Sequence, residues 1–150
     1  MSRSAGMNLV FRLGGSGFSL SVDDLVEIRE EQGALRAGDG NSRGSYILGT
    51  LAYRGQQIPV VDLRGLLRIS SDTVADELLT LLVLIGESGY WAVPVSRIEG
   101  IYPIADFSAC HTPMLFMLPG PRPYNALEFW REEPLVRCEA LWLEQFWCQA

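Results

Sequence analysis

The chain repeats a β-hairpin pattern after about seventy residues, and this repeat restricts the possible folds more than any other feature. Residues 13–28, LGGSGFSLSVDDLVEI, resemble residues 85–101, IGESGYWAVPVSRIEGI. In the alignment of the two copies, Leu13 corresponds to Ile85 at an offset of 72, and one extra residue in the second copy then aligns the later apolar positions. Each copy reads as a strand, a glycine-containing turn and a second strand. The repeat therefore predicts two similar lobes.

A fainter repeat follows each hairpin. Residues 53–67, YRGQQIPVVDLRGLL, align with residues 130–144, WREEPLVRCEALWLE, so that Tyr53 corresponds to Trp130 and Arg54 to Arg131. A lone lobe of about seventy residues buries limited apolar surface, so we expect the two lobes to pack together. We predict one domain over residues 1–150. Its approximate subdomains are 8–69 and 78–150, and terminal segments can cross between the lobes.

Strand patterns dominate both copies. Short strands separated by Gly and Pro turns predict an all-β fold made of two small barrels, with one or two short helices. The apolar run LLTLLVLI at residues 78–85 predicts a strand buried on both faces. Asp62 is expected to cap a short helix over LRGLL, because its carboxylate can accept backbone N–H bonds at a helix start. The segment CEALWLEQFW at residues 138–147 predicts a C-terminal helix.

Charge and composition restrict the partners. The net charge of −6 argues against nucleic acid as the primary partner. Three cysteines at irregular spacing are typical of a reducing compartment and not of a disulfide framework. The apolar run at residues 78–85 is too short to span a bilayer, and the N-terminal residues lack the apolar core of a signal peptide. We expect a soluble cytoplasmic protein without direct membrane insertion.

Candidate catalytic groups are few. Cys110 and His111 are adjacent, but neighbouring side chains in an extended segment point to opposite faces, and a metal needs several ligands. The residues therefore favour a protein that is not an enzyme and needs no cofactor. A small enzyme, or a ligand or metal sensor that uses the Cys110–His111 segment, stays open as the alternative. Glu27 lies between apolar Val26 and Ile28, which is typical of a contact site for a partner protein.

The segment from Gly49 to Leu67 resembles the signature of the CheW-like domain family. The matching residues are Gly49, Leu51, Arg54-Gly55, residues 58–63 (IPVVDL) and Leu66-Leu67. The resemblance implies two SH3-like five-stranded β-barrel subdomains and no enzymatic activity. It also implies an adaptor between chemoreceptors and a CheA-type histidine kinase. The kinase would contribute its regulatory domain, barrel against barrel. The methyl-accepting receptor would contribute its cytoplasmic helical tip, which lies in an apolar groove between the lobes.

The same resemblance implies the partner-binding residues. Glu27 and Arg54 match family positions that are associated with coupling, and Ile101 matches an apolar position of the groove. Tyr53, Val26 and Ile28 flank these positions. Ala52-Tyr53 replaces the family's Asn-Leu before Arg54, and Ser96 replaces a second-lobe Asp. These departures indicate a divergent member, for which a type IV pilus or another non-flagellar chemosensory system is a candidate pathway.

Overall fold

Eleven strands make up most of the part of the chain that the structure describes. The computed structural model describes residues 6–32, 46–67, 69, 78–109 and 124–149. The strands are β1 (Met7–Leu13), β2 (Ser16–Ser21), β3 (Leu25–Gln32), β4 (Ile47–Tyr53), β5 (Gln56–Val61), β6 (Leu78–Gly86), β7 (Gly89–Val95), β8 (Arg97–Pro103), β9 (Phe107–Ala109), β10 (Tyr124–Trp130) and β11 (Glu133–Cys138). The helices are α1 (Leu63–Leu66) and α2 (Ala140–Gln149), with the 3-10 turns η1 (Val22–Asp24) and η2 (Ile104–Asp106). The all-β prediction is confirmed.

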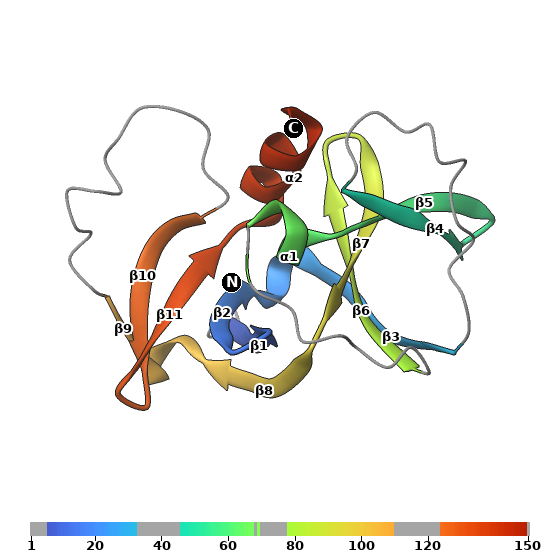
Figure 1. Cartoon of the computed structure of the whole chain (residues 1–150). Helices are drawn as coiled ribbons and strands as arrows, with labels where there is room; N and C mark the ends of the chain where they lie inside the picture. Colours follow the sequence, from blue (N-terminus) through green and yellow to red (C-terminus); the bar gives the residue numbers. More distant parts are fainter. Residues whose placement is uncertain (1–5, 33–45, 68, 70–77, 110–123, 150) are drawn as a thin grey trace, which may run out of the picture.

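The strands form two sheets with matching orders. One sheet runs β8-β1-β2-β11-β10-β9 and the other runs β3-β6-β7-β5-β4. We call them the six-stranded lobe and the five-stranded lobe. The first five strands of the former correspond in order to the five strands of the latter, and β9 is added at the edge. Each also contains one parallel pair, β11 with β2 and β5 with β7. Figure 1 shows the lobes side by side with α2 between them.

The sheets do not follow the subdomain boundaries expected from the repeat, 8–69 and 78–150. The first hairpin, β1–β2, lies in the six-stranded lobe, although β3, β4 and β5 lie in the five-stranded lobe. The second hairpin, β6–β7, does the reverse, and β8, β10 and β11 return to the six-stranded lobe. Each sheet is therefore built from both halves of the sequence, because each half gives its hairpin to the other half's strands.

The register of the two hairpins corrects the sequence alignment by one residue. Both hairpins have two-residue turns, closed by Leu13 opposite Ser16 and by Gly86 opposite Gly89. Leu13 is thus equivalent to Gly86 and not to Ile85, and the offset is 73 throughout the hairpin. The similar glycines of GGSG and GESG suggested 72, but the pairing of the flanking strands sets the true register.

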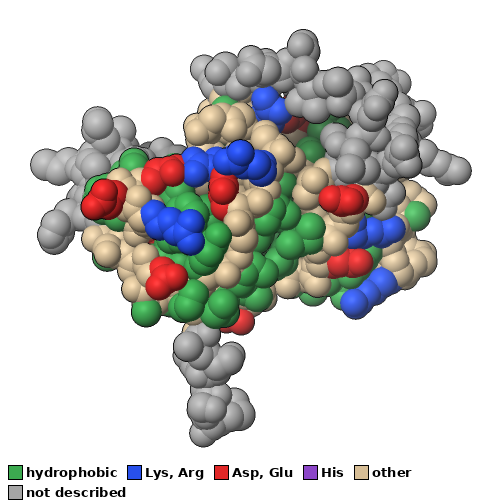
Figure 2. All heavy atoms as spheres, turned by 90° about the horizontal axis from the view of Figure 1, so that it is seen from below, with side chains coloured by type: hydrophobic (Ala, Val, Ile, Leu, Met, Phe, Trp, Pro, Cys, Tyr) green, Lys and Arg blue, Asp and Glu red, His purple; other side chains and the backbone are tan. Residues whose placement is uncertain are grey.

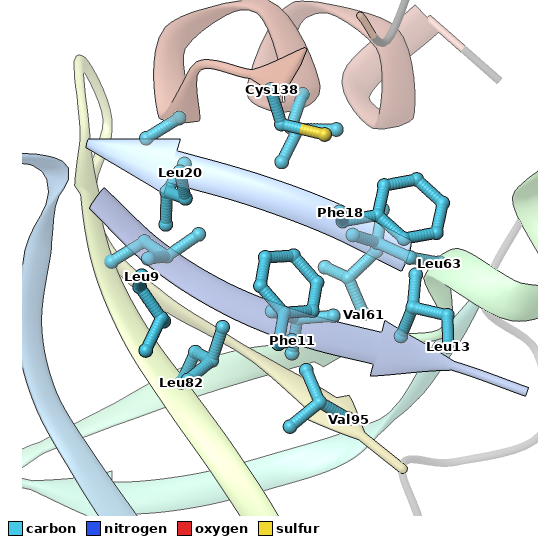
Figure 3. Packing of buried hydrophobic residues seen from close by; sticks show 14 of the residues in the cluster. Leu9, Phe11, Leu13, Phe18, Leu20, Val61, Leu63, Leu82, Val95 and Cys138 are labelled. Atoms are coloured by element: carbon cyan, nitrogen blue, oxygen red, sulfur yellow. The ribbon is translucent and has the colours of Figure 1, made fainter. Parts of the chain in front are cut away.

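Three apolar clusters lie within the described part of the chain. The largest lies between the lobes and combines β1 and β2 of the six-stranded lobe with β6 and β7 of the five-stranded lobe. Figure 3 shows its labelled members from these strands and from α1, with Leu9 close to Leu82. A second cluster lies inside the five-stranded lobe, and a smaller one around Trp130 lies inside the six-stranded lobe. We call the largest cluster the inter-lobe core.

The middle of the run LLTLLVLI, residues 81–84, is buried on both faces, as predicted. Leu81 and Val83 of β6 belong to the cluster inside the five-stranded lobe, whereas Leu82 and Leu84 belong to the inter-lobe core. The Asp62 cap is also confirmed, since the Gly65 N–H donates to Asp62 Oδ1 at 3.1 Å. β6 therefore contributes side chains to both cores, as β5 and β7 also do.

Candidate functional site

The Arg54–Gly55 turn joins β4 to β5 as a tight two-residue hairpin. Tyr53 lies opposite Gln56, and both turn residues have positive φ, 48° at Arg54 and 76° at Gly55. This is the conformation that two-residue hairpins favour, because it matches the twist of the strands. Arg54 pays a conformational cost of about 1 kcal/mol or more for the left-handed region, since its side chain has a Cβ. The turn therefore projects a fixed arginine at the end of the lobe.

The Arg54 side chain is held by aromatic rings. Its guanidinium lies 5.2 Å from the ring centre of Tyr53 and 5.7 Å from that of Tyr90, and its Nη1 donates to the Tyr90 hydroxyl at 3.2 Å. The two rings meet edge to face at 5.1 Å. Cation–π contacts of this kind are worth about 0.5–1 kcal/mol each at exposed sites. They reduce the rotamer freedom that Arg54 would lose when it binds a partner.

Glu27 and Arg29 of β3 complete the group. The Arg29 guanidinium lies 5.9 Å from the Tyr53 ring, and its Nη1 donates to the Ala52 carbonyl at 3.2 Å. Burial raises the pKa of the Tyr53 hydroxyl above its ordinary value; the charge of Arg54 opposes that rise and the charge of Glu27 adds to it. We call Glu27, Arg29, Tyr53, Arg54 and Tyr90 the Arg54 cluster.

The structure brings three of the predicted partner residues together: Glu27, Tyr53 and Arg54. Val26 is half-buried and packs against the apolar cluster that contains Tyr53, so it supports the site from beneath. Sequence reasoning missed Arg29 and Tyr90. Arg29 stands two residues after Glu27 in a strand, which places both on one face and could have indicated it. Tyr90 carried no comparable signal, because its place depends on the pairing of β7 with β5.

Ile28 and Ile101 lie apart from this cluster, at the border of the inter-lobe core. Ile28 of β3 is paired with Leu82, and Ile101 of β8 is paired with Leu9. Directly paired residues share a face of the sheet, and both partners belong to the inter-lobe core. Ile28 and Ile101 are nevertheless 39% and 43% exposed. They therefore extend the apolar faces of the two lobes into solvent.

The face seen from below in Figure 1, on the β8 side, is divided. Figure 2 shows apolar side chains gathered in its middle, between two regions that carry charged side chains. An apolar centre with a charged border is the usual composition of a protein-binding surface. Together with the exposed Ile28 and Ile101, this arrangement suits a helical partner that buries an apolar stripe.

The six-stranded lobe carries a counterpart of the Arg54 turn. Arg131 and Glu132 join β10 to β11 with φ of 51° and 64°. The Arg131 guanidinium lies 4.5 Å from the Trp130 ring centre and 4.9 Å from that of Tyr102. The fainter sequence repeat had aligned these two turns. The second ring comes from β8 here and from β7 in the other lobe, so the partner strands differ.

Among the described residues, no three or more His, Cys, Asp or Glu side chains form a group that could hold a metal ion. Cys110 and His111 lie outside the described residues. Burial raises the pKa of the Cys138 thiol to about 12, and burial also raises that of Cys148. A thiol with a raised pKa holds little thiolate at neutral pH, so neither cysteine is set up as a nucleophile.

Comparison with known proteins gives a family and a related structure. The family model of the CheW-like domain matches residues 8–109. A search of curated proteins gave no match. The crystal structure of the scaffolding protein TtCheW from Thermoanaerobacter tengcongensis is similar, with a TM-score of 0.74 and 14% sequence identity. The alignment covers 93% of this chain and 92% of that one, so nearly the whole fold is shared.

Proposed function

This chain belongs to the CheW-like domain family, and we propose that it is a non-enzymatic adaptor that couples chemoreceptors to a CheA-type histidine kinase. The observation that carries this proposal is the pair of separate surfaces on one fold: the Arg54 cluster, and the apolar border of the inter-lobe core. An adaptor needs two such surfaces, because it must hold two proteins in a fixed relation.

The apolar border would receive the cytoplasmic tip of a methyl-accepting chemoreceptor. That tip is a helical hairpin, and a helix can bury one apolar stripe between two walls. Ile28 and Ile101 would supply one wall each, since they extend from opposite lobes. Glu27 and Arg54 belong to the separate Arg54 cluster and would pair with charged residues of the other partner.

The regulatory domain of the kinase would dock on one lobe, barrel against barrel. Such a contact needs exposed strand and turn surfaces more than a deep pocket, and the two lobes offer these at their hairpins. We propose a cytoplasmic location, with no nucleic acid as a partner and no direct membrane insertion. Within the described residues, no helix has the length and apolar character needed to cross a membrane.

The experiment compares two charge reversals on equivalent turns. Arg54→Glu and Arg131→Glu both remove an arginine that stacks on two aromatic rings, so they should change folding stability to a similar extent. We expect Arg54→Glu to weaken co-sedimentation with receptor or kinase at least about tenfold, as for the loss of a charged contact at an interface. Arg131→Glu serves as the matched control and should bind like the wild type.

Unchanged binding by Arg54→Glu would contradict the role of Arg54. If Arg54→Glu bound all partners as the wild type does, Arg54 would not belong to the interface. If both variants lost binding together with their cooperative thermal unfolding, the effect would come from folding, and the milder pair Arg54→Gln and Arg131→Gln would replace them.

A further inference from the structure

A charged residue occupies the buried face of α2. The inward residues Ala140, Leu143, Glu144 and Trp147 recur at the spacing of one helix face. Ala140 and Leu143 are buried in the inter-lobe core, and the Trp147 ring lies 5.6 Å from that of Trp91. Glu144 is only 4% exposed. A buried carboxylate is costly unless it is hydrogen-bonded, so its partner is informative.

The β6–β7 turn holds this carboxylate. The backbone N–H of Glu87 donates to Glu144 Oε1 at 2.8 Å. Gly86, the preceding residue, leaves the space in which the carboxylate lies, because a Cβ at Gly86 would overlap it. Gly86 does not have a positive φ, so its backbone would accept alanine. Glycine at position 86 therefore provides the space that the Glu144 carboxylate occupies, and its backbone conformation does not require glycine.

A carboxylate from η1 binds the first backbone N–H of α2. The Ala140 N–H donates to Asp24 Oδ2 at 3.0 Å. Asp24 ends η1, the segment that leads from β2 of the six-stranded lobe to β3 of the five-stranded lobe. α2 itself follows β11 of the six-stranded lobe, and Figure 1 shows it between the lobes. The helix is thus joined to one lobe by its chain, and to the other by apolar packing and by the hydrogen bond from Glu87 to Glu144.

We propose that Glu144 is a positioning residue that fixes the five-stranded lobe against α2 and so sets the width of the apolar border that carries Ile28 and Ile101. Apolar packing in the inter-lobe core is non-directional. A hydrogen bond has a preferred length and angle, so it selects one placement. The consequence for receptor binding rests on the proposed function; the placement of the lobes does not.

The contact is tested by a double-mutant cycle in the full chain. Gly86→Ala should lower the melting temperature because its methyl group meets the Glu144 carboxylate, and Glu144→Ala should lower it by loss of the bond. In the double variant the methyl group has room, so its melting temperature should equal that of Glu144→Ala or exceed it. The Glu87 amide should exchange with deuterium faster in Glu144→Ala than in the wild type. Additive temperature losses, or unchanged exchange, would overturn the contact.

The placement of the lobes is tested by a distance measurement. Spin labels on Gln57 of β5 and Ser108 of β9, both exposed, report the separation of the lobes in a background that carries Cys110→Ser and Cys148→Ser. We expect one narrow distance distribution for the otherwise wild-type chain and a broader or shifted one for Glu144→Ala. An identical distribution in both proteins would overturn the positioning role.

The functional consequence is tested with two probes from the same genome, a receptor helical hairpin and a kinase regulatory domain. Glu144→Ala should weaken the hairpin, which contacts both lobes, about fivefold or more. The regulatory domain docks on one lobe and should bind unchanged. Equal weakening of both probes would mark a loss of folded protein and overturn the proposal. If the wild type bound neither probe, the adaptor function would fail, while the distance measurement would still decide the role of Glu144.

Discussion

The interior of the six-stranded lobe offers a sharp test, because the other lobe supplies its control. Four positions there are polar: Asn8, Ser19, Glu128 and Arg137. By strand register the equivalent positions of the five-stranded lobe are Leu81, Ala92, Leu51 and Val60, all buried in its apolar cluster. We call the four polar residues the interior quartet. The same position in the fold is thus filled by an ionic network in one lobe and by hydrocarbon in the other.

The interior quartet is internally bonded. The Ser19 hydroxyl donates to Glu128 Oε1, and Arg137 Nη1 lies 3.5 Å from Glu128 Oε2. With the Asn8 amide oriented toward Arg137, its oxygen accepts from Nη1 at 3.3 Å. Asn8 and Ser19 are fully buried and Glu128 is 8% exposed. Glu128 is the shared acceptor, so its removal leaves the Ser19 hydroxyl without its acceptor and the Arg137 charge without its counter-ion.

We predict opposite outcomes for one substitution and for four. Glu128→Leu should cost about 3 kcal/mol, the lower end for breaking a buried ion pair, because Arg137 keeps some solvent contact. For a chain of this size that is a fall of about 6–12 °C in melting temperature. Replacing the whole interior quartet by the residues of the five-stranded lobe should be neutral or stabilising by up to about 4 kcal/mol.

Urea unfolding followed by tryptophan fluorescence, with calorimetry beside it, measures both changes. Glu128→Gln is the intermediate variant, since its amide oxygen still accepts from Ser19. A quadruple variant, with all four residues of the interior quartet replaced, that is less stable than Glu128→Leu would refute this prediction. That result would mean that the ionic network is the stabilising core of the six-stranded lobe and that the two lobes are not interchangeable in their interior.

Two further predictions concern ionisable groups. Arg97 and Arg12 lower the pKa of Glu99, and Arg12 lowers that of Glu133, below the ordinary value of 4.5. Carboxyls with a lowered pKa stabilise the fold above pH 4.5, and this contribution is lost as the pH falls. The melting temperature of Arg12→Gln should therefore fall less steeply below pH 4.5 than that of the wild type. Equal slopes of melting temperature against pH in the two proteins would contradict this prediction. Burial keeps the Cys138 thiol protonated and covered. An alkylating reagent should therefore leave Cys138 unmodified in the folded chain and label it after unfolding, as mass spectrometry would show. Labelling of Cys138 in the folded chain at the rate of exposed Cys148 would contradict this prediction.

Local patterns predicted the parts of the fold that local physics decides. The alternating strands, the short turns, the doubly buried β6 and the Asp62 cap all follow from residue periodicity or from one side chain near its backbone partners. The exchange of hairpins between sheets did not follow. It depends on parallel pairings such as Val136 with Phe18, and neither strand carries a local mark of the strand beside it.

Alternation alone would misplace one face of β1. In MNLVFRL, Asn8 and Arg12 alternate with apolar residues, which is typical of a strand with one face in water. The sheet curls so that this face becomes the interior of the six-stranded lobe, and Asn8 is fully buried there. Glu144 was hidden for a similar reason, because its hydrogen-bond partner lies 57 residues away in the sequence.

The Arg54 cluster was partly predictable. Glu27, Tyr53 and Arg54 came from the family resemblance, and the structure places them around one aromatic pair. Arg29 and Tyr90 complete the cluster because the sheet order β3-β6-β7-β5-β4 brings their strands close to β4 and β5. A single sequence does not show this order. Ile28 and Ile101 were predicted as contact residues, but their relation to the inter-lobe core became evident only from the register.

The central claim is that one chain holds a receptor and a kinase at the same time. Size-exclusion chromatography with light scattering, on the purified chain mixed with a receptor helical hairpin and a kinase regulatory domain from the same genome, measures this directly. We predict a ternary complex with one copy of each component, and its loss when Ile101→Glu places a charge in the apolar border. Competition between the two partners for the chain, or no complex with either, would contradict the claim.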